Sequence, residues 1–266
     1  MQGRLIDSEK KNRIQYFPSK NWKTEFYIAD KINLNLMEWT INIENIKKNP
    51  LIQKKKNQNE LNFIKESNIK IESVTCDFFM QKPFFKKKFY IFKSQIFYFL
   101  KNLIKNCESL NIKYLILPLV DNSSIKSQIE ENKLVADMHK LENYLNNTKI
   151  LFEIDYRPSH VKRFMSKFNS NKFGINYDTG NSASLGYDIQ EEIKYFRYVD
   201  NIHIKDRLFN GISVRLGRGN FKFKNFFNLL KKKNYKGNFI LQTARSSSGN
   251  HIMELKKNLF FLKKFI

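Results

Sequence analysis

Four short segments of this chain end in polar side chains that could together hold a metal ion and move a proton. They are LFEID with Glu153, NYDTGN with Asp178, NIHIKD with His203 and FILQT with Gln242. Two carboxylates and an imidazole form a ligand set that suits Mn²⁺, Co²⁺ or Zn²⁺ better than Ca²⁺. The fourth residue is an amide, where a further anion would complete the set. The sequence therefore predicts a divalent-ion site with an unusual fourth member.

The elements that position these residues follow from their spacing of 25, 25 and 39 residues. Each interval has room for a strand, a helix and two loops, as a parallel crossover requires. Each segment is a brief apolar run before its polar residue, which is typical of parallel strands whose carboxyl ends converge on one pocket. Eight strand signals alternate with about eight helix signals along the chain. This alternation predicts an α/β fold, a (β/α)8 TIM barrel that forms a single domain over residues 1–266.

The predicted elements alternate along the whole chain. The expected strands lie at residues 2–5, 34–39, 70–78, 113–120, 149–155, 172–178, 201–206 and 238–243. The expected helices lie at residues 21–32, 59–66, 88–109, 128–146, 159–168, 188–196, 223–233 and 251–265. No Pro/Gly linker or internal repeat marks a domain break.

Several candidate residues have a structural explanation as well as a functional one. A single strand histidine such as His203 is more often a hydrogen-bonded core residue than a metal ligand. Glu153 follows an apolar run, where an unpaired carboxylate would be costly, and its partner could be Lys205 or Arg207 rather than a metal. The occurrence of three such residues on successive strands favours the metal site.

Two loops after the last two predicted strands could bind a phosphate, because barrels often hold phosphate there. RLGRGNF carries Gly217 and Gly219, whose backbone N–H groups could approach an anion, beside Arg215. TARSSSGN carries Arg245 before a predicted helix. The same pattern also describes an ordinary tight turn, and the sequence does not separate the two readings.

The charge of the chain is strongly positive, with a formal net charge of +23 and a pI near 9.8. The lysines are spread through the chain together with an excess of Asn, Ile and Phe, which indicates a general compositional bias. We therefore expect a charged, solvated surface and no nucleic-acid partner. No leader pattern or long apolar run appears, so a cytoplasmic protein without a membrane partner is expected. A homo-oligomer is possible.

The motifs QGRL, CDFFM, LPLVD, NYDTGNSASLG, HIKDR and LQTAR resemble the sugar phosphate isomerase/epimerase group of the xylose isomerase-like TIM barrels, over nearly the whole chain. The resemblance implies a metal held by Glu153, Asp178, His203 and the fourth position, Gln242. Epimerases of this superfamily use the first and last of these positions as an acid/base pair, and an amide cannot take a proton at neutral pH. Asn181 stands where such enzymes often carry a histidine.

One-base chemistry is compatible with these departures. Glu153 would remove the proton from the carbon next to the carbonyl of a small sugar or sugar phosphate, and Lys205 or Arg207 would stabilise the enediolate. The expected cofactor is Mn²⁺, Co²⁺, Mg²⁺ or Zn²⁺, and further substrate contacts are expected from the remaining candidates, Glu38, Asn181, Arg207, Arg215, Gly217, Gly219 and Arg245. The alternatives are a non-catalytic carbohydrate-binding barrel and a DNA-repair endonuclease of the same superfamily. The endonuclease would need a histidine-rich metal cluster.

Overall fold

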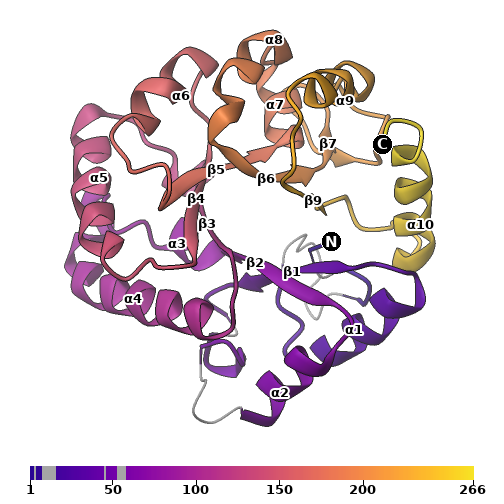
Figure 1. Cartoon of the computed structure of the whole chain (residues 1–266), viewed down its shortest axis with the longest axis horizontal. Helices are drawn as coiled ribbons and strands as arrows, with labels where there is room; N and C mark the ends of the chain where they lie inside the picture. Colours follow the sequence, from indigo (N-terminus) through magenta and orange to yellow (C-terminus); the bar gives the residue numbers. More distant parts are fainter. Residues whose placement is uncertain (3, 8–15, 45, 53–57) are drawn as a thin grey trace.

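The computed structural model describes residues 1–2, 4–7, 16–44, 46–52 and 58–266. Seven parallel strands form one sheet in the order β1-β2-β3-β4-β5-β6-β9, so each strand pairs with the next along the chain except where β7 and β8 form a separate two-stranded ladder. Figure 1 shows this sheet curled into a ring, viewed along its axis, with the helices around the outside. The predicted TIM barrel is confirmed.

The strands and helices have the following bounds. The strands of the large sheet are β1 Leu36–Ile41, β2 Lys70–Cys76, β3 Tyr114–Leu119, β4 Lys149–Ile154, β5 Phe173–Asp178, β6 Val199–Ile204 and β9 Asn238–Leu241, and the small ladder is β7 Asp206–Arg207 with β8 Ser213–Val214. The helices are α1 Trp22–Lys31, α2 Gln58–Glu66, α3 Asp77–Gln81, α4 Lys93–Ser109, α5 Gln128–Glu142, α6 Pro158–Met165, α7 Thr179–Leu185, α8 Ile189–Glu192, α9 Phe223–Lys232 and α10 His251–Leu262. Short 3-10 helices are η1 Ile46–Lys48, η3 Lys87–Phe92, η4 Asp121–Ser123 and η5 Ile193–Tyr198.

Among the described residues, Gln2 is the one that occupies the eighth position of the barrel. Its N–H donates to Leu241 of β9 at 3.0 Å, and it forms a parallel bridge with Glu38 of β1. The prediction of a strand over residues 2–5 is wrong for the described residues Arg4 and Leu5, and residue 3 lies outside the described residues. The N–H groups of Leu5 and Ile6 donate instead to the carboxylate of Glu25 on α1, at 2.9 and 3.2 Å, so they are not available to a neighbouring strand.

Other differences from the predicted elements occur where strands end. Helices α3 and α7 were not expected, and each begins directly after a strand, at Asp77 and Thr179. Asp178 is the N-cap of α7, and its carboxylate accepts hydrogen bonds from the N–H groups of Gly180 and Asn181. The helix predicted from residue 88 begins instead as η3 before α4, and the helix predicted over residues 188–196 divides into α8 and η5.

The apolar core lies between the strands and the surrounding helices. Phe152 of β4 contacts Phe164 of α6 and Phe173 of β5 at ring-centroid distances of 5.5 and 5.9 Å. Successive strand residues point to opposite faces, so the residues next to these apolar ones point into the barrel. None of the helices in the described part of the chain combines the length and apolarity that a membrane crossing requires.

Candidate functional site

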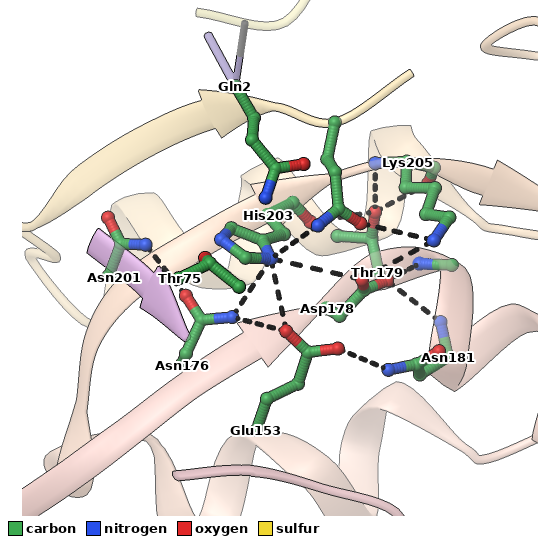
Figure 2. Close-up of polar contacts among 12 residues, drawn as sticks. Gln2, Thr75, Glu153, Asn176, Asp178, Thr179, Asn181, Asn201, His203 and Lys205 are labelled. Carbon is green, nitrogen blue, oxygen red and sulfur yellow. Dashed lines mark hydrogen bonds and ion pairs between the residues drawn. The ribbon is translucent and has the colours of Figure 1, made fainter. Parts of the chain in front are cut away.

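Three adjacent strands bring Glu153, Asp178 and His203 together at the carboxyl end of the barrel. They lie on β4, β5 and β6, and all three side chains are buried. One potential ligand atom from each lies within 4.8 Å of the others. The Nδ1 atom of His203 is 3.1 Å from Glu153 Oε2 and 4.0 Å from Asp178 Oδ2 (Figure 2). This geometry matches the predicted convergence and suits a shared divalent cation.

The Asp178 carboxylate is the clearest sign that a cation fits here. Its Oδ1 accepts the N–H groups of Gly180 and Asn181 at 2.7 and 2.9 Å. Its Oδ2 is buried without a hydrogen-bond partner, and the nearest opposite charges, His203 Nδ1 and Lys205 Nζ, are each 4.0 Å away. A buried carboxylate oxygen without a partner is costly, and a coordinated cation would compensate it.

Glu38 lies beneath His203 and fixes the orientation of its ring. His203 Nε2 is 2.9 Å from Glu38 Oε1, and the same carboxylate accepts hydrogen bonds from Ser73 and Thr75 at 2.8 and 2.6 Å. The expected strand-end position of Glu38 is wrong, because β1 continues to Ile41 and leaves Glu38 inside the barrel. A carboxylate behind a metal-binding imidazole selects the tautomer and turns the other nitrogen toward the metal.

The carboxylates around His203 control its protonation. Burial lowers the pKa of His203, but the charges and hydrogen bonds of Glu38 and Glu153 outweigh burial and raise the pKa to about 10. In return, His203 and the hydroxyl donors hold the pKa of Glu38 below its usual value in spite of its burial.

Asparagine side chains hold both oxygens of Glu153. Asn176 Nδ2 donates to Oε2 and Asn181 Nδ2 donates to Oε1, each at 2.9 Å, and Asn201 in turn donates to Asn176 Oδ1 at 2.7 Å. Sequence reasoning included Asn181 but missed Asn176 and Asn201. Their signal is the polar residue at every second position of otherwise apolar parallel strands, in GINYD and NIHI.

Gln242 and Lys205 complete the rim of the site. Lys205 Nζ donates to Gln242 Oε1 at 3.1 Å, while Gln242 Nε2 lies 3.3 Å from His203 Nδ1. The amide oxygen therefore faces Lys205, and metal coordination through that oxygen would require the amide to rotate.

The predicted phosphate-binding residues are not gathered at this site, and each of them donates at least one hydrogen bond to an internal group. The N–H groups of Gly217 and Gly219 both donate to the buried Asp206 carboxylate at 2.9 Å. Arg215 forms a bidentate pair with Glu254 of α10, with its shorter contact at 2.6 Å. Arg245 donates to the carbonyl oxygen of Ile6. Arg207, which was predicted to contact the substrate, donates to the carbonyl oxygen of Gly211 and, at 3.4 Å, to Oδ1 of Asn181, so it lies beside the site.

Asp77 and Arg4 are two further charged groups at the mouth of the barrel, and both are buried. Burial and the charges of Glu153 and Glu38 raise the pKa of Asp77 to about 7, although Arg4 opposes the shift. Burial lowers the pKa of Arg4 to about 9. Neither residue was among the predicted binding residues.

The fold and the triad together define a parallel α/β barrel whose strand ends carry a potential metal centre. The match of residues 92–265 to the family described as xylose isomerase-like TIM barrel shows that the chain belongs to that family. No protein of curated function matches the sequence.

Solved structures share this fold at low sequence identity. The D-allulose 3-epimerase of Methylomonas sp. in complex with D-allulose has a TM-score of 0.74 and 15% identity, over 94% of this chain and 93% of the epimerase. The IolI protein with a bound zinc atom has a TM-score of 0.72 and 17% identity, over 93% and 95% of the two chains. A xylose isomerase domain protein from Planctomyces limnophilus has a TM-score of 0.73 and 16% identity, over 90% and 91%.

Proposed function

We propose that this protein is a metal-dependent isomerase or epimerase of a small sugar or sugar phosphate. The observation that carries the proposal is the convergence of Glu153, Asp178 and His203, with a buried Asp178 oxygen that has no hydrogen-bond partner. Membership of the family and the structural similarity to a D-allulose 3-epimerase support the same class of substrate.

Glu153, Asp178 and His203 would hold the ion, which could be Mn²⁺, Co²⁺, Mg²⁺ or Zn²⁺. Carboxylate and imidazole ligands suit these ions, and zinc is bound by the similar IolI protein. A bound divalent ion supplies charge that stabilises the enediolate form of an open-chain sugar. Gln242 would join as a ligand only after its amide rotates away from Lys205.

Glu153 is the proposed base. Asn176 and Asn181 each donate a hydrogen bond to one oxygen of its carboxylate. When one oxygen gives up its hydrogen bond to contact a substrate, the hydrogen bond to the other oxygen still orients the carboxylate. Glu153 would take the proton from the carbon next to the carbonyl and return it to the former carbonyl carbon, while the proton of the adjacent hydroxyl passes to the former carbonyl oxygen, so that an aldose and a ketose interconvert. Lys205 donates to the substrate oxygen on which negative charge develops. Gln242 cannot exchange a proton, so the reaction uses one carboxylate base.

Deuterium exchange provides the test. The Mn²⁺-loaded protein is incubated in D₂O with pentoses, hexoses and their phosphates, and NMR monitors exchange at the carbon next to the carbonyl. Glu153→Gln should reduce exchange by about 10²-fold or more, as expected for loss of a general base. Glu191→Gln, at an exposed carboxylate paired with Lys194, is the matched control and should leave exchange unchanged. Undiminished turnover in Glu153→Gln would remove Glu153 from the role of base.

A carbohydrate-binding barrel without catalysis is the second candidate function. It is favoured by Gln242, because the amide stands where a second acid/base carboxylate would be. This second function predicts saturable sugar binding without any deuterium exchange in the metal-loaded protein. The endonuclease alternative receives less support, because the metal-capable group found among the described residues contains a single histidine.

A further inference from the structure

Asp77 and Arg4 lie at the mouth of the barrel, where each follows residues whose side chains point into the barrel interior. Ser73 and Thr75 of β2 point inward, since both donate hydrogen bonds to Glu38. Asp77 follows β2 directly, as the first residue of α3, and it interacts electrostatically with Glu153, Glu38 and His203 of the barrel interior. Arg4 lies two residues after Gln2 and donates to its Oε1 at 3.2 Å. Asp77 and Arg4 therefore lie at the same end of the barrel as Glu153, Asp178 and His203.

Both charged groups retain unused hydrogen-bonding capacity although they are buried. Asp77 is 4% exposed and Arg4 is 8% exposed. Among the residues the structure describes, no hydrogen bond reaches the Asp77 carboxyl. Arg4 Nη1 and Nη2 donate to the carbonyl oxygen of Thr243 and to Gln2 Oε1, and Arg4 Nε is buried without a partner. The two groups interact electrostatically, but no ion pair joins them within the described part of the chain. Buried polar groups without partners are rare in folded proteins, and each could be satisfied by a ligand.

Asp77 lies where it could contact one end of a ligand whose other end is bound at the triad. With Gln2 counted as the eighth position of the ring, β2 is separated from β6 by the same number of strands in both directions. Asp77 therefore lies across the barrel mouth from His203. A sugar chain held at the triad would extend toward Asp77 and Arg4.

We infer that Asp77 and Arg4 form a second binding subsite for the hydroxyl groups of a neutral sugar, and that the protein selects unphosphorylated sugars over sugar phosphates. This inference rests on the proposed function and names its substrate class. A carboxyl and a guanidinium that do not contact one another can accept from and donate to vicinal hydroxyls.

At the position of Asp77, the negative charges of Glu153 and Glu38 act more strongly than the positive charges of Arg4 and His203, so this position opposes a phosphate ester. A dianion near Asp77 would meet the field of Glu153 and Glu38 as well as that of Asp77 itself. The glycine-rich loop that could have bound phosphate already holds the Asp206 carboxylate, through the N–H groups of Gly217 and Gly219.

Equilibrium binding tests the subsite independently of catalysis. Isothermal titration of the Mn²⁺-loaded protein is carried out with D-allulose, D-fructose and their 6-phosphates. At least one neutral sugar should bind more tightly than its phosphate. Asp77→Ala should weaken binding of that sugar by roughly 10- to 100-fold, the range for loss of a hydrogen bond to a charged group. Asp77→Asn, which keeps the shape, should weaken it less, and Glu191→Gln is the control.

Three results would overturn the inference. They are tighter binding of a phosphate than of its parent sugar, unchanged sugar affinity in both folded Asp77 variants, and no binding of any of the four ligands. Deuterium exchange in the same samples separates this inference from the proposed function. Exchange that persists with sugar phosphates as preferred substrates refutes the subsite alone, whereas sugar binding that depends on Asp77 without exchange in the wild type refutes the catalytic proposal alone.

Discussion

Binding of a divalent ion at the triad should release one proton from His203. The pKa of His203 is about 10 in the metal-free protein, because the charges of Glu38 and Glu153 outweigh the effect of burial. The ring therefore carries both protons throughout the neutral range. Its Nδ1 faces Glu153 and Asp178, so an ion shared with these carboxylates must replace the Nδ1 proton.

The size of this competition follows from the shift in pKa. Neutral pH lies about three units below the pKa of His203, and each unit corresponds to about 1.36 kcal/mol. Proton competition should therefore oppose metal binding by about 4 kcal/mol at about pH 7. As the pH rises, the apparent metal affinity should increase about tenfold per unit and become constant above about pH 10.

Calorimetry in buffers of different ionisation enthalpy measures the proton count directly. At about pH 7.5, the slope of observed enthalpy against buffer enthalpy should correspond to about one proton released for each Mn²⁺ bound. Glu38→Gln removes one of the two charges that raise the pKa of His203, so it should reduce the proton count at the same pH. A slope near zero in the wild type would refute the reasoning. A full proton released in His203→Gln would refute it as well.

Three further predictions concern single substitutions. Gln242→Glu should strengthen Mn²⁺ binding by about tenfold or more in calorimetry, because it adds a fourth charged ligand position beside the triad. Burial raises the pKa of Glu192 to about 7 although Ser182 and Tyr177 donate hydrogen bonds to it, so stability should fall by about 3 kcal/mol as the pH rises from about 4.5 to 7. Urea unfolding of Glu192→Gln should show this pH dependence abolished. Gly219→Ala should cost about 1–3 kcal/mol in the same assay, because its Cβ would collide with the Asp206 carboxylate, and unchanged stability would contradict this.

The triad could be predicted from the sequence because its signal is local. Glu153, Asp178 and His203 each follow an apolar run at or near the end of a strand, and parallel strands that follow one another in sequence also lie side by side. Strand alternation alone therefore specifies that the three side chains converge. The barrel could be predicted for the same reason.

Properties that depend on tertiary contacts could not be predicted in this way. The apolar residues around Glu38 continue the strand to Ile41, and only the pairing with β2 fixes how far β1 extends. The loop of Gly217 and Gly219 has the composition of an anion site, and it does bind an anion. That anion is Asp206 of the same chain, whose position after β6 is visible in the sequence while its contact with the loop is not.

The interior of this barrel is polar, and its few unsatisfied groups indicate where ligands belong. Buried polar groups are tolerated when they are hydrogen-bonded, and hydrogen bonds link Asn201 to Asn176 and Asn176 to Glu153, although Asn201 Oδ1 itself has no partner. At the mouth the pattern changes, because Asp178 Oδ2 has no hydrogen-bond partner and neither has the Asp77 carboxyl among the described residues. A hydrogen-bonded network beneath charged groups that lack partners is the arrangement expected of a preorganised binding site. The first of these groups can be satisfied by a cation and the second by a hydroxyl donor, and a metal-bound sugar that spans the mouth would satisfy both.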